Sequence, residues 1–182
     1  MSKDDFTDLF NRNWDVVENI MPALKRASDA NIPGLKVGYK KFPQSSTGNN
    51  YVLDQAKKFQ GKASGDANLS FEVNGTSFDN IENGVLIDRK YGHATSIFKD
   101  TDPLYNEIPG LDDFIEEGAG KVLIKNQKRV NSLLTQARRQ LSSIDGKDVT
   151  IEWEISSDLG ARGISQVFQS VGITNIVVKY IP

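Results

Sequence analysis

The sequence predicts an α/β protein with a mixed β-sheet and helices on both of its faces. Residues 69–90 contain three short stretches of alternating apolar and polar side chains, the pattern of half-buried strands. Asn-Gly pairs at 74–75 and 83–84 separate these stretches, and this dipeptide is a strong signal for a tight hairpin. Further along, two strand-like segments each follow a helix-like segment, so we expect crossover connections within the sheet.

The first fifty residues are predicted to form a helical segment followed by a loop. Apolar side chains recur at three- and four-residue spacing over residues 4–29, which predicts helix, and Pro22 is expected to kink or break it. Prolines and glycines are frequent over residues 31–50, which favours a linker or mobile loop. Residues 51–60 then predict a short helix that ends at Gly61.

The remaining elements comprise a group of strands and then alternating helices and strands. The central strands are expected at 69–73, near 76–81 and at 85–90, joined as an antiparallel meander. Residues 100–118 are expected to be irregular. The last four elements are expected to be a helix at about 119–143, a strand at 148–155, a helix at 158–171 and a strand at 174–181. Together with the helix at 51–60, these elements give the order αβββαβαβ after the extra N-terminal helices.

The composition excludes several kinds of chemistry. The chain has 182 residues, no cysteine and one histidine, His93. Disulfides, thiolate nucleophiles, cysteine-ligated metals and multi-histidine metal sites are therefore excluded, and an enzyme would depend on carboxylates, lysine, hydroxyls and amides. The formal charge of −2 gives no indication of nucleic acid, so such a partner depends on local charge.

The sequence also bears on location. No apolar run approaches the roughly 18–20 residues that span a bilayer, so we expect no membrane anchor. The acidic start, MSKDDFTDLF, lacks the basic and apolar regions of a signal peptide. We therefore expect either a cytosolic protein or one that is exported by another route, and the chain could be a fragment of a larger protein.

A group of charged residues around the second Asn-Gly turn is the candidate site. Side chains alternate across a strand, so Asp88 and Lys90 are expected on one face and Arg89 on the other. Leu86 shares the Asp88 face and is expected nearer the apolar core. Asp79 precedes Asp88 by nine residues, and the hairpin between them can place the two carboxylates side by side.

Two adjacent carboxylates and a lysine indicate metal-assisted chemistry. The carboxylates repel each other unless a cation lies between them, and oxygen ligands suit Mg²⁺ or Mn²⁺. Lys90 can orient the attacking water or stabilise the charge on a pentacovalent phosphate. These groups suffice for hydrolysis of a phosphodiester. The residues alone are equally compatible with a solvated hairpin face that carries a cross-strand ion pair.

Several short motifs between residues 50 and 182 extend this pattern. They are Tyr51 and Gln55 in the helix before the sheet, Ser77-Phe78-Asp79, the run Leu86-Ile87-Asp88-Arg89-Lys90-Tyr91-Gly92, Gln136, Trp153 and Val177-Val178-Lys179-Tyr180-Ile181-Pro182. With these motifs the chain resembles the PD-(D/E)xK nuclease superfamily, which has the restriction-endonuclease fold. More narrowly, it resembles toxin domains of that fold at the C-termini of bacterial polymorphic and contact-dependent toxins.

The resemblance implies a function and a set of roles. Asp79 and Asp88 would bind Mg²⁺ or Mn²⁺, and Lys90 would be catalytic. Phe78 stands where the superfamily name has proline, and Asp88 replaces the more usual glutamate. The implied protein is a secreted or delivered nuclease toxin that acts on DNA in the target-cell cytoplasm and is neutralised by a cognate immunity protein. Residues 1–49 lie outside the resemblance, and residues 50–182 would form the nuclease domain.

A basic face on the long predicted helix supports a nucleic-acid partner. No acidic residue occurs between Glu117 and Asp145. The residues predicted to hold the phosphate backbone are Lys121, Lys125, Lys128, Arg129 and Arg139. The alternative interpretation is a solvated helix face. Gln136 is predicted to reach the site from the same helix.

Two further residues are candidates for roles at the site. Glu72 points away from the apolar face of its strand and is either a third metal ligand or simply exposed. Gln55 either orients a catalytic water or caps the sheet. Three functions stay open at this point: a DNase, an RNase that cleaves for example transfer RNA, and a non-catalytic module that binds nucleic acid or an acidic protein.

Overall fold

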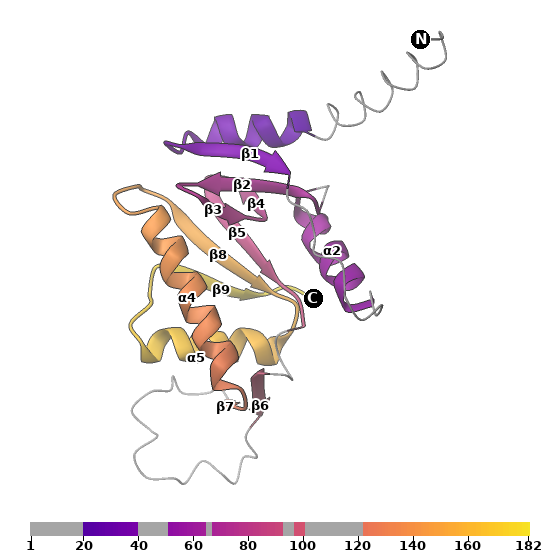
Figure 1. Ribbon diagram of the computed structural model, residues 1–182, viewed down its shortest axis with the longest axis vertical. Helices are drawn as coiled ribbons and strands as arrows, with labels where there is room; N and C mark the ends of the chain where they lie inside the picture. Colours follow the sequence, from indigo (N-terminus) through magenta and orange to yellow (C-terminus); the bar gives the residue numbers. More distant parts are fainter. Residues whose placement is uncertain (1–19, 40–50, 65–66, 93–96, 101–121) are drawn as a thin grey trace.

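The computed structural model describes residues 20–39, 51–64, 67–92, 97–100 and 122–182 and has a mixed α and β architecture. The elements in chain order are a helix over 20–30, β1 (Leu35–Tyr39), α2 (Tyr51–Ser64), β2 (Leu69–Val73), β3 (Thr76–Phe78), β4 (Asn80–Glu82), β5 (Val85–Lys90), β6 (Phe98–Asp100), β7 (Val122–Ile124), α4 (Gln127–Ser143), β8 (Thr150–Ile155), α5 (Asp158–Ser170) and β9 (Ile176–Tyr180) (Figure 1). None of the helices described is long and apolar enough to span a bilayer.

The larger sheet is mixed, as the sequence predicts. Its strand order is β4-β5-β8-β9, with β4 and β5 antiparallel and with β5, β8 and β9 mutually parallel. A second sheet contains the antiparallel strands β1, β2 and β3, and β6 and β7 form a separate two-stranded ribbon. One apolar cluster includes buried side chains from both of the larger sheets. These two sheets therefore share a core.

Helices cover both faces of the larger sheet. Trp153 of β8 faces α5, where its ring centroid lies 5.1 Å from that of Phe168, and its indole nitrogen donates a hydrogen bond to Gln140 of α4. Arg89 of β5 lies on the other face, where its guanidinium donates to the backbone carbonyl of Phe59 in α2 at 2.7 Å. The expectation of helices on both faces is therefore confirmed.

Both predicted hairpin turns are present. Asn74 and Gly75 have φ values of 48° and 77°, and Asn83 and Gly84 have values of 49° and 79°. Positive φ at both central residues is the requirement of a type I′ turn, which the Asn-Gly pair meets at low cost. The second predicted strand is interrupted at Asp79, because β3 pairs with β2 whereas β4 pairs with β5. The meander thus passes from one sheet to the other at this residue.

The prediction of a loop over residues 31–50 is wrong at β1. This strand pairs antiparallel with β2, from Leu35 opposite Val73 to Tyr39 opposite Leu69. It is an edge strand, a position that tolerates glycine because only one side of the strand must complete the ladder. The first 49 residues thus contribute a strand to the same sheet as the predicted nuclease domain.

Helix boundaries also differ from the prediction. Helix α2 continues through Gly61 to Ser64. Helix α4 begins at Gln127 rather than near 119. Residues 122–124 are all apolar, two of them are β-branched, and they form a strand that pairs with β6. The predicted ends of the last strands and of α5 agree within two residues. Pro22 lies inside the helix over 20–30, so the expected break does not occur at this residue. Residues 4–19 and 101–118 lie outside the described residues.

Candidate active site

Asp79 and Asp88 come opposite each other where β4 and β5 pair. Asn80 is paired with Ile87 in antiparallel register, so Asp79 and Asp88, the next pair along, lie opposite each other. The Asp79 backbone N–H donates to the Ile87 carbonyl at 2.9 Å, and its Oδ2 accepts from the Arg89 N–H at 2.8 Å. Both aspartates are buried, at 6% and 5% exposure. The backbone of β5 therefore holds the Asp79 carboxylate at the N–H of Arg89, the residue that follows Asp88.

Three donors meet a single oxygen of Asp88. Its Oδ2 lies 2.7 Å from Lys90 Nζ, 2.7 Å from Gln136 Nε2 and 2.5 Å from Gln140 Nε2. Lys90 lies on the same strand two residues later, so strand alternation places it on the same face. Lys90 is 6% exposed and Gln140 is fully buried. The Asp88 charge is thus balanced in a desolvated setting, where charge-assisted hydrogen bonds are strong.

Trp153 lies beside this cluster and touches two of its members. It is the partner of Asp88 in the parallel register of β5 and β8. The Lys90 ammonium lies 4.6 Å from the centroid of its ring, within the range of a cation–π interaction. Its Nε1 donates to Gln140 Oε1 at 2.6 Å. The cluster therefore draws side chains from β5, α4 and β8.

A cleft of about 460 Å³ opens at Lys90 beside the first turns of α4. Its lining residues are Lys90, Ile97, Asn126, Lys128, Arg129, Ser132, Leu133 and Gln136. Because Lys90 is buried and yet lines the cleft, it forms part of the floor. The α4 N-terminus carries no acidic residue in its first turn, and the helix dipole adds positive potential there. The cleft is therefore suited to an anion.

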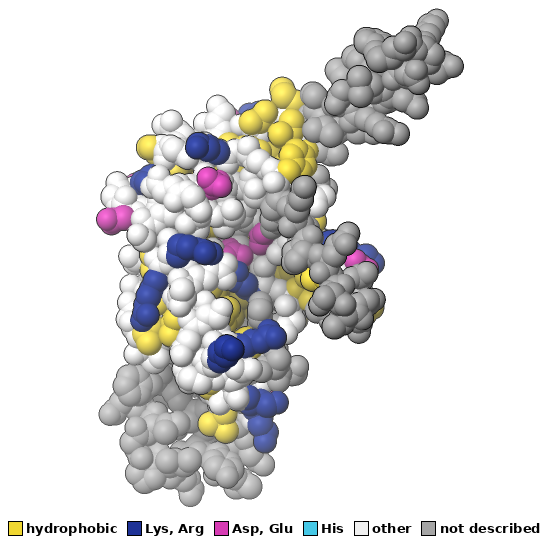
Figure 2. Space-filling model, viewed as in Figure 1, with side chains coloured by type: hydrophobic (Ala, Val, Ile, Leu, Met, Phe, Trp, Pro, Cys, Tyr) yellow, Lys and Arg dark blue, Asp and Glu magenta, His cyan; other side chains and the backbone are white. Residues whose placement is uncertain are grey.

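The surface around the cleft is also basic. Lys125, Lys128, Arg129 and Arg139 are all exposed. Figure 2 shows Lys and Arg side chains along the side of the molecule on which Figure 1 places α4. This surface supplies the positive charge that phosphate groups require.

A larger hollow, of about 770 Å³, lies at the other end of α4, and its lining includes Leu141, Asp145 and Thr174. Its lining includes neither Lys90 nor Gln136, whereas both of these residues line the smaller cleft. We assign the candidate site to the smaller cleft, because buried ionisable groups in a concavity are the usual mark of chemistry.

The β6–β7 ribbon holds the wall of the cleft. Lys125, which follows β7, donates its backbone N–H to the carbonyl of Ile97, a lining residue, at 2.7 Å. The ring of Phe98 lies directly on Gly163 of α5, where a Cβ atom would come within 2.6 Å of the ring. The ribbon therefore positions the start of α4 relative to α5.

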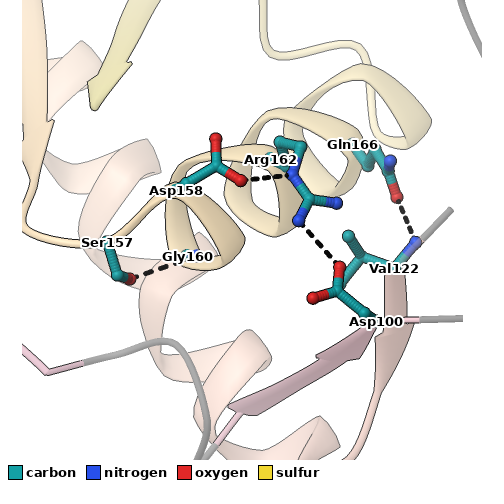
Figure 3. Close-up of polar contacts among 7 residues, drawn as sticks. All are labelled: Asp100, Val122, Ser157, Asp158, Gly160, Arg162 and Gln166. Atoms are coloured by element: carbon teal, nitrogen blue, oxygen red, sulfur yellow. Dashed lines mark hydrogen bonds and ion pairs between the residues drawn. The ribbon is translucent and has the colours of Figure 1, made fainter. Parts of the chain in front are cut away.

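Polar contacts complete this attachment, and Figure 3 shows them. Arg162 of α5 bonds Asp158 at 2.8 Å and Asp100 of β6 at 2.7 Å, and these hydrogen bonds raise the pKa of Arg162. Gln166 accepts from the backbone N–H of Val122 in β7 at 3.2 Å. Arg162 and Gln166 are one helical turn apart, so α5 presents both to the ribbon.

The structure brings together four of the predicted site residues. Asp88, Lys90 and Gln136 lie in the cluster described above. Asp79 is the fourth, and it lies opposite Asp88 in the strand register with its carboxylate bonded to the backbone N–H of Arg89. Gln55 lies on α2 one turn before Phe59, the residue that contacts Arg89 on the opposite face of the sheet. Its predicted role stays a prediction.

Glu72 does not join the two aspartates. It lies opposite Lys36 of β1 and Ser77 of β3, on the side of β2 that faces away from the buried Phe71 and Val73. Within the residues that the structure describes, no group of three or more His, Asp or Glu side chains could hold a metal ion. A third ligand from Glu72 is therefore not part of the geometry.

The basic residues predicted to bind phosphate divide into three groups. Lys128 and Arg129 line the cleft, whereas Lys125 and Arg139 are exposed outside its lining. Lys121 lies outside the described residues. Sequence reasoning missed Gln140, and it named Trp153 among the motifs of the resemblance without giving it a role at the site. The spacing of Gln140, four residues after Gln136 on one helix face, is the signal that could have identified it.

Comparisons of the chain with protein-family models, curated proteins and solved structures found no match. The geometry and chemistry of the cluster therefore carry the functional conclusion.

Proposed function

We propose that the protein is a metal-dependent nuclease that hydrolyses phosphodiester bonds, with DNA as the favoured substrate. The observation that carries this proposal is the position of Asp88, which lies opposite Asp79 and is paired with Lys90, a residue at the floor of a basic cleft. Carboxylates, a lysine and a phosphate-binding surface in one place are the components of metal-assisted phosphodiester hydrolysis.

The donor set suits Mg²⁺ or Mn²⁺. Mg²⁺ in phosphate-processing sites is commonly held by one or two carboxylates and keeps several waters and substrate oxygens as its other ligands. Asp79 and Asp88 would supply these carboxylates, and Asp88 would bind through Oδ1 because the three donors meet Oδ2. When bound, the ion polarises the scissile phosphate and favours ionisation of a water molecule.

The protein side chains would divide the remaining work. Lys90 orients the attacking water and stabilises the negative charge that develops on the phosphate. Lys128 and Arg129 hold the backbone phosphates at the rim of the cleft. Gln136 lines the cleft and donates to Asp88, so it links the substrate side to the aspartate.

The order of the elements supports a restriction-endonuclease-like core. From α2 onward the chain has a helix, the strands β2, β3 with β4, and β5, and then α4, β8, α5 and β9. With β3 and β4 counted as one interrupted strand and the β6–β7 ribbon as an addition, this is the order αβββαβαβ. On this basis we propose a toxin of that fold, delivered to the cytoplasm of a target cell.

A toxin of this kind requires a cognate immunity protein. The basic surface beside the cleft favours a partner with an acidic surface that covers it. Co-expression of such a partner should restore growth to cells that produce the protein. An immunity protein that protects cells without covering the cleft would contradict this mode of inhibition.

Two other functions use the same surface. An RNase, for example one that cleaves transfer RNA, would use the same phosphate chemistry. A non-catalytic binding module is favoured by one observation, namely that Lys90 already balances the charge of Asp88. Binding by such a module would be sensitive to salt and independent of divalent metal.

Digestion of plasmid DNA and of total RNA, each with Mg²⁺ and with EDTA, separates these functions. We expect cleavage of DNA that requires Mg²⁺ and is lost in Asp79→Ala and Lys90→Ala variants that remain folded. Cleavage of RNA alone would identify the RNase. Salt-sensitive binding of nucleic acid without cleavage would establish the binding module and overturn the proposed function.

A further inference from the structure

We propose that Gln140 and Trp153 are positioning residues that fix Asp88 and Lys90 for metal and substrate. This inference rests on the proposed function and extends it to side chains that touch neither substrate nor ion. Gln140 lies between Asp88 and Trp153, with 2.5 Å from its Nε2 to Asp88 Oδ2 and 2.6 Å from its Oε1 to Trp153 Nε1.

The polarity of these two bonds determines the orientation of the Gln140 amide. An indole N–H can only donate, so it must meet the amide oxygen. The amide nitrogen is then directed at the aspartate, and a carboxylate can accept from it. If the amide were rotated by half a turn, its NH₂ group would face the indole N–H and its oxygen would face the carboxylate, so neither hydrogen bond could form. Gln140 is fully buried, so water cannot replace either bond.

Gln136 makes the same contact to Asp88 without this constraint. It is half-buried and lines the cleft, so its amide is accessible to a substrate. Of the two glutamines that bond Asp88, Gln140 therefore supplies the fixed hydrogen bond, and Gln136 supplies the hydrogen bond that faces the substrate. With Oδ2 held from the protein interior, Oδ1 is the oxygen that Asp88 can offer to a metal ion.

Trp153 acts on both charged members of the cluster. It orients Gln140 through its N–H and attracts the Lys90 ammonium to its ring face at 4.6 Å. Its indole is fully buried, and its ring lies edge-on to that of Phe168 with 5.1 Å between the two centroids. One rigid side chain thus sets the geometry of an aspartate and a lysine on the neighbouring strand.

The test is a double-mutant cycle on the full chain, with Mn²⁺ alone as the probe. The variants are Trp153→Phe, which removes the donor and keeps a ring, Gln140→Met, and both together. Partners of metal ligands typically contribute 10–100-fold to metal affinity, so we expect about a tenfold higher Mn²⁺ Kd in each single variant. Because Trp153 acts on Asp88 through Gln140, the double variant should bind Mn²⁺ as Gln140→Met does.

A second readout and a control separate positioning from simple packing. In cleavage assays we expect both single variants to lower kcat with KM for an oligonucleotide unchanged. Phe168→Leu is the control, because it disturbs the packing of Trp153 without touching either bond of Gln140. It should lower the melting temperature and leave Mn²⁺ affinity unchanged.

Each outcome decides the proposal. The proposal is overturned if Trp153→Phe raises the Mn²⁺ Kd as much in the Gln140→Met background as in the wild type. It is also overturned if Phe168→Leu loses Mn²⁺ affinity. In either case, cleavage by the wild type would leave the proposed function intact. A wild-type protein that neither binds Mn²⁺ nor cleaves refutes the proposed function and this inference with it. If Trp153→Phe does not fold, Gln140→Met alone decides, since unchanged Mn²⁺ affinity in that variant overturns the proposal.

Discussion

At the scale of single residues, the site depends on two opposite charges in a buried setting. Asp88 and Lys90 lie 2.7 Å apart with side-chain exposures of 7% and 8%. Such a pair contributes little net stability, because desolvation offsets the attraction, but removal of one partner leaves an uncompensated buried charge. Stability alone therefore does not explain this buried pair, whereas a role in chemistry at the site does.

This balance predicts a specific stability pattern. Lys90→Met should lower the free energy of unfolding by about 3–5 kcal/mol, because Asp88 is left without its cation. The double variant Asp88→Asn with Lys90→Met should recover much of that loss. Urea unfolding of the two variants and of wild type measures both effects. Equal stability of the single and double variants would mean that the two side chains are not coupled.

At the scale of elements, the cleft depends on how the β6–β7 ribbon is fastened to α5. Phe98 requires the absence of a side chain at Gly163, and the Arg162 network ties β6 to the helix. The ribbon in turn bonds to Lys125, just before α4 begins. A change at Gly163 should therefore reach the cleft through the ribbon.

Gly163→Ala tests this connection. The added Cβ would lie 2.6 Å from the Phe98 ring, so the ring must move, and overpacking of this kind costs about 1–3 kcal/mol. We expect a lower melting temperature and weaker binding of nucleic acid. Ser165→Ala on the same helix is the matched control. Unchanged binding in a destabilised Gly163→Ala variant would show that the ribbon does not position the cleft.

The edge of the sheet contains an ion pair with a predictable pH dependence. Lys179 of β9 lies 2.5 Å from the buried Glu152, and this hydrogen bond, together with the charge of Glu152, raises the pKa of Lys179 above its ordinary value of 10.5. A raised pKa stabilises the fold below the ordinary value, and that contribution is lost as the pH rises through the folded-state pKa. The difference in unfolding free energy between wild type and Lys179→Met should therefore be present at pH 8 and shrink as the pH rises beyond 10.5. A difference that stays constant over this range would contradict the pairing.

At the scale of the whole molecule, charge is arranged so that one side can hold a polyanion although the net charge is −2. Lys128 and Arg129 line the cleft, whereas Arg138 does not line it and comes more than two helical turns later in α4. Contacts with phosphate give binding that weakens with salt in proportion to the number of contacts.

The salt dependence can be measured without catalysis. In EDTA, the variant Lys128→Ala with Arg129→Ala should bind duplex DNA more weakly, and its log–log salt slope should be smaller by about 1–2. Arg138→Ala removes one charge from the same helix and should leave the slope unchanged. Fluorescence anisotropy over a range of NaCl concentrations provides both values. If the wild type and both variants have equal slopes, DNA does not bind at Lys128 and Arg129.

Local signals explain which parts of this fold could be predicted. The Asn-Gly pairs determine their turns through backbone conformation, and strand alternation places Asp88 and Lys90 on one face. The break at Asp79 could not be predicted, because each Asn-Gly turn shows only that neighbouring segments pair, and neither turn shows that the segment between them is divided between two sheets. Strand β1 was missed because an edge strand with Gly38 has the composition of a loop.

The candidate site divides in the same way. Asp79, Asp88 and Lys90 are joined by a hairpin, so their proximity follows from sequence spacing. Gln140 reaches Asp88 only because α4 crosses the face of β5 and β8, and no local pattern shows where a helix will pack.

Plasmid digestion by wild type and by Asp88→Asn, each with Mg²⁺ and with EDTA, is the most direct test of the proposed chemistry. Asparagine keeps the shape of the side chain and removes the charge that a divalent ion requires. We expect the wild type to cleave DNA only with Mg²⁺ and the folded Asp88→Asn protein to be at least about a hundredfold slower. Full activity of Asp88→Asn, or cleavage by wild type in EDTA, would contradict a metal-dependent nuclease centred on Asp88.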